Sequence, residues 1–277
     1  MMFAQKEWSG VIRCAGLILP ATALGMLAMV SGGVSPVIWG QQTAAFFVFA
    51  CLAKLLKRAF RKIPVAMRAA ALALILAATL LGVEAGGAKR WLDLGVFTVN
   101  AAMMVLPALL ILISGMECPW PVMLCVMAVL SFQPDLSQLA AFSAAVLPVL
   151  WRYRERRVWS AASLLLMVLC MIWCVAAPTA LEPVSYSEGV LPMLGGISVL
   201  LLAGGCLALA LIPGMMAYRF CRKGETRLLS LAVYYGILLL FSFTGAYPVP
   251  FMGFGLSPFA GYWLAWMCLP EEEGRRF

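Results

Sequence analysis

The chain has 277 residues, of which 64% are hydrophobic and only 12% are charged, and its formal net charge is +8. Water-soluble globular proteins are about 45–50% apolar and about 25% charged, so a soluble fold is excluded. The apolar stretches lack the two-residue alternation of barrel strands and are typical of membrane-spanning helices.

Ten apolar segments follow one another along the chain, separated by short polar breaks. A spanning helix needs roughly 20 apolar residues, and these segments leave no room for a separate soluble domain. We therefore predict an all-α polytopic integral membrane protein with about ten transmembrane helices, forming a single transmembrane domain over residues 1–277. The predicted spans are 11–31, 36–56, 65–83, 96–114, 119–132, 137–151, 158–177, 190–213, 228–245 and 254–269.

The first predicted span is retained rather than cleaved. Lys6 and Arg13 mark the start of an apolar run that extends to Val30, which is longer than the core of a signal peptide and lacks a convincing small-residue cleavage site. We therefore expect this segment to remain as a membrane helix.

Basic residues are strongly biased to one side of the predicted topology. Clusters at 54–68, 152–157 and 219–227 fall on the same side, together with both termini, and only Lys89 and Arg90 lie on the other. This is the positive-inside pattern, so we predict a multi-pass membrane protein with both termini in the cytoplasm. The net charge of +8 therefore needs no nucleic-acid partner to explain it.

The segment 119–132 is the weakest of the predicted spans. At about 1.5 Å per residue it covers only about 21 Å of a hydrocarbon core that is roughly 30 Å thick. The alternative is that the region 96–151 contains one full span and a re-entrant pair. Either arrangement leaves both termini on the same side.

Two adjacent cations lie in the predicted outer loop after the third span. Residues 86–92 read GGAKRWL, in which the glycines permit a tight turn and Trp91 can lie at the level of the lipid headgroups. Adjacent Lys89 and Arg90 suit a diphosphate headgroup, since the Arg fork can bind two oxygens while Lys acts as a point charge. The alternative is an ordinary interfacial anchor with a salt bridge to Asp93.

A polar break at 131–138 separates the fifth and sixth predicted spans. Pro134 can end one helix, and Asp135 can cap the next by accepting from its unpaired backbone donors. Polar groups such as Gln133 and Asp135 near membrane depth are nevertheless candidates for a functional site.

The loop between the seventh and eighth spans and the break before the tenth complete the predicted outer face. The loop carries Glu182 and Glu188, while the break at 244–258 is rich in Pro and Gly and ends near Ser257. Irregular backbone at membrane depth must be buried in protein or line a cavity.

Three of these stretches resemble, in order, the motifs of the SEDS family of bacterial cell-shape and cell-division membrane proteins. Residues 87–95, GAKRWLDLG, are similar to the family's N-G-A-R-R-W-I/L-x-L-G loop. Residues 133–136, QPDL, are similar to Q-P-D-L-G-T, and residues 250–257, PFMGFGLS, to P-F-I-S-Y-G-G-S. The resemblance covers about residues 84–269 and implies a SEDS-like fold of ten spans.

The sequence departs from the family pattern at two places. Residues 100–103, NAAM, stand where the family usually has Q-P-S-E. Family polymerases carry a long outer loop with an essential aspartate, whereas the loop at 177–189 is short and has none. Glu182 or Glu188 could substitute for it. Alternatively, the stretch 186–188 corresponds to the family's D-F-I-F-x-x-x-x-E-E region.

The resemblance implies a location in the bacterial cytoplasmic (inner) membrane and a role in peptidoglycan synthesis for cell shape or division. It implies inverting glycosyl transfer from lipid II, an undecaprenyl-diphosphate-linked precursor, and a class B penicillin-binding protein, a transpeptidase, as partner. With no histidine in the chain, Asp135 and Glu182 are the first candidates for the catalytic base and Glu188 the next. The implied substrate-binding residues are Lys89, Arg90, Trp91, Gln133 and Ser257.

A non-enzymatic role stays open beside glycosyl transfer, as a binder or transporter of the lipid-linked precursor or as a scaffold that recruits a transpeptidase. An unrelated small-molecule transporter fits less well, because the spans contain almost no ionisable residue. We predict no metal site and assign no cofactor. Without histidine, a divalent ion would be left with oxygen ligands such as Asp135 and Glu182.

Overall fold

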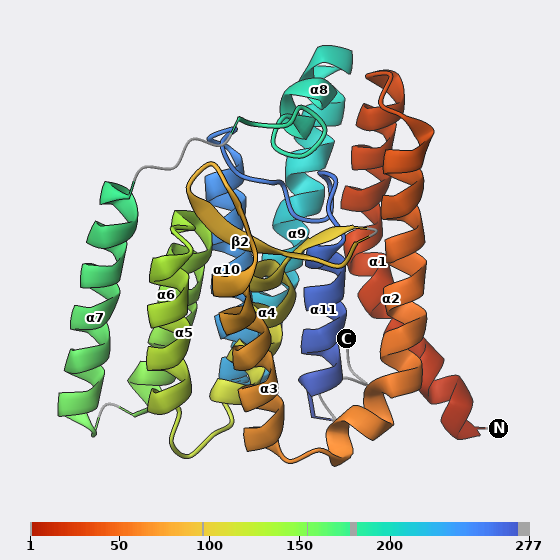
Figure 1. The fold of residues 1–277 in the computed structure, drawn as a ribbon. Helices are drawn as coiled ribbons and strands as arrows, with labels where there is room; N and C mark the ends of the chain where they lie inside the picture. Colours follow the sequence, from red (N-terminus) through yellow and green to blue (C-terminus); the bar gives the residue numbers. More distant parts are fainter. Residues whose placement is uncertain (1, 96, 154, 178–181, 271–277) are drawn as a thin grey trace.

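The computed structural model describes residues 2–95, 97–153, 155–177 and 182–270 and is shown in Figure 1. In this part of the chain, α-helices alternate with short connections, and one small sheet interrupts them. The helices are α1 (Met2–Ser31), α2 (Pro36–Lys62), α3 (Val65–Ala78), α4 (Ala101–Ile113), α5 (Trp120–Phe132), α6 (Leu136–Arg152), α7 (Arg157–Ala176), α8 (Val190–Ile197), α9 (Val199–Lys223), α10 (Thr226–Ser242) and α11 (Ser257–Cys268). A 3₁₀ turn (Thr79–Leu81) precedes strands β1 (Val83–Ala85), β2 (Ala88–Asp93) and β3 (Thr98–Asn100).

The helices confirm the predicted all-α polytopic fold. Each of the ten predicted segments holds a helix, and the segment 190–213 holds two. The break between α8 and α9 lies at Ser198, whose backbone is extended at φ −165° and ψ 139°. Its hydroxyl accepts a hydrogen bond from the N–H of Leu200, so Ser198 ends one helix and caps the next.

Three helical segments in the described part of the chain are long and apolar enough to cross a membrane. They are Gly10–Ser31, Arg157–Ala176 and Val199–Lys223. Helix α2 has 27 residues but carries several cations in its second half, and the remaining helices are shorter. Helices α4 and α5, for example, have 13 residues each, which corresponds to about 20 Å at 1.5 Å per residue. Their ends continue into the sheet, the turns and the irregular segments that build the site described below.

Helices α4 and α11 form the centre of the bundle. Helix α11 packs against α4 and α2, and α10 packs against α6 and α9. Nearly every side chain of α4 and α11 is buried. Helix α7 stands at the margin in Figure 1, and its exposed side is apolar, with Ile172 62% and Trp173 60% exposed. An apolar outer face of this kind is expected of a helix that faces lipid.

Helix α5 runs antiparallel to α6 from one end of the bundle to the other. At one end, Arg152 Nη1 donates to the Ser114 carbonyl over 3.1 Å, and the Tyr153 hydroxyl donates to the Met116 carbonyl. At the other end, α5 and α6 are joined by the short turn at 133–135. Helix α5 therefore runs beside α6 in the opposite direction, and whether it crosses the membrane or belongs to a re-entrant pair stays a prediction.

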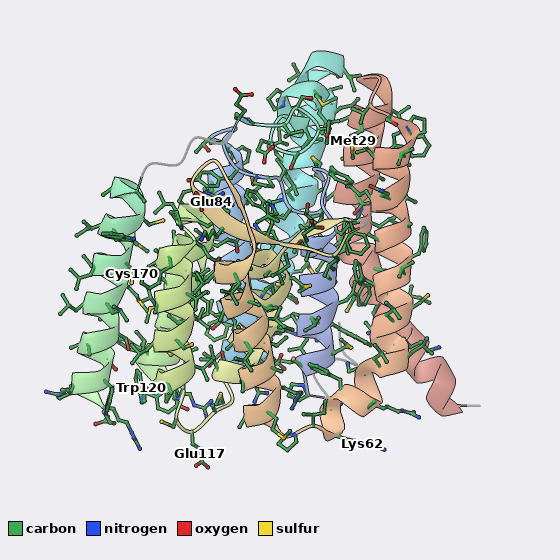
Figure 2. All side chains as sticks on the ribbon, viewed as in Figure 1. Met29, Lys62, Glu84, Glu117, Trp120 and Cys170 are labelled. Atoms are coloured by element: carbon green, nitrogen blue, oxygen red, sulfur yellow. The ribbon has the colours of Figure 1, made fainter. Side chains whose placement is uncertain are left out.

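The two ends of the bundle differ in their charged residues. Figure 2 shows Glu84 beside the sheet, and Lys62 and Glu117 at the opposite end. The predicted basic clusters lie at that opposite end, at the end of α2, the start of α7 and the end of α9; Arg154, Arg275 and Arg276 lie outside the described residues. Which end faces the cytoplasm stays a prediction from the positive-inside rule.

The stretch 83–100, expected as an outer loop followed by the start of a span, forms a three-stranded antiparallel sheet in the order β1-β2-β3. Ala85 pairs with Ala88 across Gly86 and Gly87, which have φ of 55° and 79°. Two successive positive φ values are typical of a type I′ hairpin turn, which glycine adopts without steric cost. The predicted tight turn is confirmed, and the sheet fixes the direction of every side chain in the first motif.

Candidate functional site

Strand β2 separates the two cations of the first motif. Successive side chains of a strand point to opposite faces, so neighbours in sequence do not act together. Arg90 is buried, whereas the Lys89 side chain is 41% exposed and its Nζ lies 3.7 Å from the Glu84 carboxylate. Asp93, the partner considered for the two cations, accepts a hydrogen bond from the Gly95 N–H over 2.7 Å.

Arg90 connects the sheet to the turn between α5 and α6. Its Nη2 donates to the Pro134 carbonyl over 3.0 Å, and its Nε lies 3.6 Å from Asp135 Oδ2. The side chains of Arg90 and Asp135 are only 9% and 3% exposed. An ion pair that is buried to this extent is costly to break, because removing one partner leaves a buried charge unpaired.

Asp135 has a second structural role at the start of α6. Its Oδ1 accepts from the Gln138 N–H over 3.2 Å and from the Ser137 hydroxyl over 2.7 Å. The predicted helix cap is therefore confirmed. Both carboxylate oxygens face internal partners, so Asp135 holds the second motif in position against the first.

Two amides beneath the ion pair fix the surrounding helices. Gln138 Oε1 accepts from the Tyr234 hydroxyl over 2.6 Å, which joins α6 to α10. Gln133 Nε2 donates to Thr79 Oγ1 and, over 3.3 Å, to the Leu76 carbonyl, which joins the end of α5 to the end of α3. Gln133, predicted as a substrate-binding residue, is fully buried and makes these contacts within the protein.

Ser257 brings the third motif to the sheet. Its hydroxyl accepts from the Asn100 N–H over 2.8 Å, and Asn100 is the register partner of Trp91 across β2 and β3. The Asn100 side chain in turn accepts from the Met103 N–H over 3.0 Å and caps α4. Through Asn100, the first motif is therefore joined to Ser257 of the third motif. Asn100 is also the first residue of the stretch 100–103, which stands in place of the family's usual Q-P-S-E.

The third motif itself is held by Gln42 of α2. The amide Nε2 of this buried residue donates to the carbonyls of Phe251 and Met252 over 3.3 and 3.2 Å. Phe251 has a φ of +65°, which is rare for a residue with a side chain and is kept only where the surroundings fix it. Sequence analysis missed Gln42, although an amide within an apolar span is a recognisable signal.

The short loop before α8 is attached to the third motif through its main chain. Phe254 N–H donates to the Tyr186 carbonyl over 2.8 Å, and Val249 N–H donates to the Ser187 carbonyl over 3.3 Å. A Cβ atom on Gly253 would collide with the Ser187 carbonyl oxygen, so this close approach requires glycine. The loop at 184–189 thus lies directly on the third motif.

The three candidate carboxylates occupy different environments. Asp135 is buried in the ion pair, and Glu188 Oε2 accepts from the Val184 N–H over 2.8 Å, which closes the loop at 184–189. Glu182 is exposed. The structure therefore brings Asp135 to Arg90 and Glu188 to the third motif, and leaves Glu182 at the surface.

Tyr247 is a further polar residue at this end that sequence analysis did not select. Burial raises the pKa of its hydroxyl above the usual value, and the negative charge of Asp135 acts in the same direction while Arg90 opposes it. Its ring packs edge-to-face on Phe241 at 5.0 Å. Tyr247 therefore lies within electrostatic reach of the ion pair and keeps a neutral hydroxyl that can donate a hydrogen bond.

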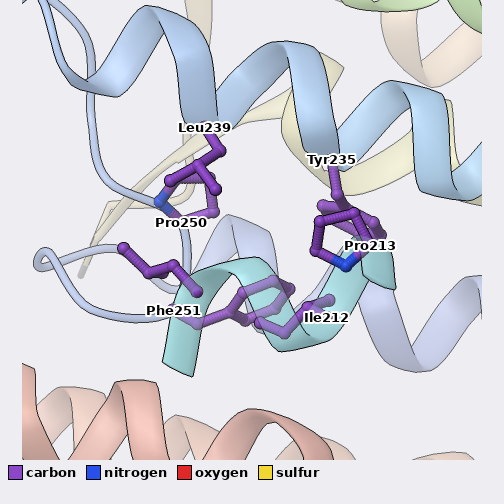
Figure 3. Close-up of a pocket in the computed structure, with 7 residues that line it drawn as sticks. Ile212, Pro213, Tyr235, Leu239, Pro250 and Phe251 are labelled. Carbon is purple, nitrogen blue, oxygen red and sulfur yellow. The ribbon is translucent and has the colours of Figure 1, made fainter. Parts of the chain in front are cut away.

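A small cavity beneath the third motif does not extend this site. Figure 3 shows it between α9, α10 and the stretch at 250–251; its volume is about 10 Å³ and its lining is apolar apart from Tyr235. Such a volume holds about one water molecule, which suits the buried Tyr235 hydroxyl, for which the described residues provide no hydrogen-bond partner. The cavity is too small for a sugar or a lipid headgroup.

The described residues contain no group of three or more His, Cys, Asp or Glu side chains that could hold a metal ion.

No protein-family profile matches the chain, and no curated protein matches it by sequence.

Solved structures match the fold. The rod-shape-determining protein RodA of Thermus thermophilus, a SEDS protein, superposes with a TM-score of 0.62 at 20% identity over 92% of this chain and 93% of RodA. A point mutant of the same protein gives a TM-score of 0.61 over 92% and 94% of the two chains. A chain from a structure on how a peptidoglycan synthase complex coordinates polymerization and crosslinking gives 0.59 at 21% identity, over 94% and 97%.

These matches cover nearly the whole of both chains, and the three motifs that suggested the resemblance lie together at one end of the bundle. The chain is a polytopic membrane protein with a SEDS-like fold.

Proposed function

We propose that the protein acts at the outer surface of the bacterial inner membrane, on an undecaprenyl-diphosphate-linked peptidoglycan precursor, as a glycosyltransferase. The observation that supports this most is the meeting of three separate motifs at one end of a RodA-like fold, through the Arg90–Asp135 pair and the Asn100–Ser257 hydrogen bond. Buried polar networks of this kind are costly to assemble and are typical of functional sites.

The cations contribute to the proposed site in different ways. Lys89 is partly exposed, and its ion pair within the described residues is with the exposed Glu84 over 3.7 Å, so a diphosphate can compete for it. Arg90 is fixed by Pro134 and Asp135 and adds a positive potential without leaving its internal partners. Trp91 is half-buried, with its ring centroid 5.9 Å from the Arg90 guanidinium carbon, and an aromatic ring at a membrane surface can pack on a lipid or a sugar.

In the proposed reaction, a carboxylate takes the proton from the acceptor sugar hydroxyl as its oxygen attacks the anomeric carbon of the donor. The bond from that carbon to the lipid diphosphate breaks, the diphosphate keeps the electron pair, and the anomeric configuration inverts. Glu182 is the best-placed base, because it is exposed while Asp135 and Glu188 accept hydrogen bonds within the protein. Asp135 then acts as a positioning residue.

A class B penicillin-binding protein is the proposed partner. The similar chain in the peptidoglycan synthase structure belongs to a complex that couples polymerization to crosslinking. Pairing with a transpeptidase would place the growing glycan beside the enzyme that crosslinks it.

The test is glycan polymerization from purified lipid-linked disaccharide, with the protein alone and with a co-encoded transpeptidase. Glu182→Gln should lower the rate by about 10²–10⁴-fold without changing membrane levels, because an amide cannot accept the proton. Asp93→Asn is the matched control, since this exposed residue at the same end keeps an oxygen for the Gly95 N–H. Polymerization that is unaffected by Glu182→Gln, Asp135→Asn and Glu188→Gln would exclude these carboxylates as the base.

The second candidate is a non-enzymatic protein that binds the same precursor or recruits the transpeptidase. It is favoured by the internal pairing of two of the three candidate carboxylates. Precursor binding or transpeptidase recruitment without any polymerization by the wild-type protein would establish this role.

A further inference from the structure

Arg68, in the first turn of α3, is a buried cation with unpaired hydrogen-bond donors. Its exposed fraction is 8%, and neither Nε nor Nη1 has a hydrogen-bond partner among the described residues. The guanidinium carbon lies 5.6 Å from the centre of the Phe60 ring, and the side chain lies beside the Cys268 thiol. Neither neighbour is a carboxylate. Because buried donors without partners are costly, Arg68 is expected to bind an acceptor beyond these residues.

The unpaired donors lie where three helices meet, at the end of the bundle opposite the sheet. Helix α11 packs against α2, and Lys57 Nζ of α2 lies 3.4 Å from the centre of the Trp266 ring of α11 (Figure 1). Arg68 and Cys268 bring the start of α3 to the same place. Leu269, which ends α11, is only 1% exposed. The chain is therefore still packed in this junction of α2, α3 and α11 where the last helix ends.

The helices of the junction supply no carboxylate. Residues 8–83 contain seven Lys and Arg side chains and no acidic residue, and α11 contains no acidic residue either. The positive-inside rule accounts for a basic surface at this end, but it does not require one of the cations to be buried. An acidic partner for Arg68 must therefore come from another segment of the chain or from another molecule.

The sequence places such a segment directly after the last helix. Glu271, Glu272 and Glu273 follow Pro270, and these three are a quarter of the 12 acidic residues of the chain, the others of which occur singly. An extended chain advances at most about 3.6 Å per residue, so Glu271 lies within about 7 Å of Leu269 and Glu273 within about 14 Å. Only a short loop has to close for a carboxylate of this segment to meet Arg68, so the entropic cost is small.

We propose that the acidic segment 271–273 docks on the junction of α2, α3 and α11, where a carboxylate accepts hydrogen bonds from the unpaired donors of Arg68. Charge-assisted hydrogen bonds of this kind are about twice as strong as those between neutral groups. Helix α11 is then held at both ends, because Ser257 at its start is bonded to Asn100. The docking does not depend on the proposed glycosyl transfer.

The first experiment measures the thermal unfolding of the full-length protein in detergent. The triple variant Glu271→Gln/Glu272→Gln/Glu273→Gln should melt about 2–4 °C below the wild type, the shift expected when one such interaction is lost. In an Arg68→Met background, the same triple change should shift the melting temperature by less than about 1 °C, because its partner is already absent. Arg275→Gln/Arg276→Gln is the matched control, since it changes charge in the same tail but removes no carboxylate.

Equal shifts in the two backgrounds would overturn the proposal, because the carboxylates would then act somewhere other than on Arg68. A triple variant that melts like the wild type would also overturn it and would leave water, an anionic lipid or a second molecule as the partner of Arg68.

The second experiment leaves the sequence of the tail unchanged and digests the protein with carboxypeptidase Y. Arg68→Met should raise the rate at which Glu273 to Glu271 are removed by about tenfold, since the docked segment is protected. Arg157→Met, which removes an exposed cation at the start of α7, should be digested like the wild type. Equal digestion of the Arg68→Met protein and the wild type would show that Arg68 does not hold the segment.

Discussion

At the sheet end of the bundle, the cations of β2 are paired with carboxylates, whereas at the opposite end four cations surround an open cavity. Arg90 lies 3.6 Å from Asp135, and Lys89 lies 3.7 Å from Glu84. The cavity at the opposite end lies between α1 and α9, and its lining includes Arg13, Arg219, Arg222 and Lys223. The protein therefore uses charge in two ways.

At the sheet end, a buried ion pair holds two segments of the chain together. A buried pair such as Arg90–Asp135 fixes the position of two segments far apart in sequence, because each group has lost its water and only the other group compensates for that loss. At the opposite end, the exposed Arg222 and Lys223 lie in the last turn of α9 and complement the negative end of its dipole, a contribution of about 0.3–1 kcal/mol each. Substitutions at the sheet end are therefore expected to change stability according to how deeply the altered group is buried.

The largest effect is expected for Arg90→Ala, which leaves Asp135 buried without its partner. The free energy of unfolding should fall by about 3–5 kcal/mol, measured by denaturant or thermal unfolding in detergent. The double variant Arg90→Ala/Asp135→Ala should lose less than the sum of the two single changes. A stable Arg90→Ala protein that fails only in precursor binding would break the comparison, since Arg90 would then act on the substrate rather than on the fold.

The next effect concerns the attachment of the loop at 184–189. Gly253→Ala should lower the free energy of unfolding by about 1–3 kcal/mol, because the added methyl group meets the Ser187 carbonyl oxygen and forces the main chain apart. Gly236→Ala in α10 is the control, since its methyl group meets no neighbouring atom within 4 Å. The control should be neutral or stabilising by up to about 1 kcal/mol. Equal behaviour of the two variants would mean that the loop is not held closely.

A smaller effect is expected for Ser257→Ala, which removes the acceptor of the Asn100 N–H. The loss should be about 0.5–1.5 kcal/mol in unfolding experiments. Ser257→Thr keeps the hydroxyl and should recover part of the loss. A Ser257→Ala protein with wild-type stability and impaired precursor binding would assign the hydroxyl to the substrate, as the family resemblance implies.

The smallest effect is expected for Lys89→Ala. Its pair with Glu84 is largely exposed, so removing it should change the free energy of unfolding by about 0–1 kcal/mol. Precursor binding should weaken and lose part of its dependence on salt, because the exposed cation is the one free to meet a diphosphate. If Lys89→Ala lost as much stability as Arg90→Ala, the different exposure of the two side chains would not determine their roles.

The helices of this fold could be predicted from the sequence because a segment surrounded by lipid has to form its backbone hydrogen bonds within itself. Apolar runs therefore form helices, and polar breaks end them. Most ends of the predicted segments lie within a few residues of a helix end. The split at Ser198 was not predicted, because one serine in an apolar run does not by itself end a helix. The short sheet was not predicted, because its polar residues are equally compatible with an ordinary loop.

The site was predicted only in part, for a geometric reason. The motifs at 87–95, 133–136 and 250–257 were recognisable, and they do meet. The prediction that Lys89 and Arg90 bind a diphosphate together did not anticipate strand β2, in which adjacent side chains point to opposite faces. Gln42 lies 209 positions from Phe251 in the chain, and nothing local to either residue indicates that they pair.

The attachment of the loop at 184–189 has a consequence for engineering. Two of its bonds to the third motif come from the main-chain carbonyls of Tyr186 and Ser187, so its position depends little on the side chains of the residues before it. Residues inserted just after Glu182 would lengthen an exposed loop whose far end is already fixed. The entropic cost of closing the longer loop grows only with the logarithm of its length. That point is therefore a natural graft site, at which a longer catalytic loop can be transplanted onto this small scaffold.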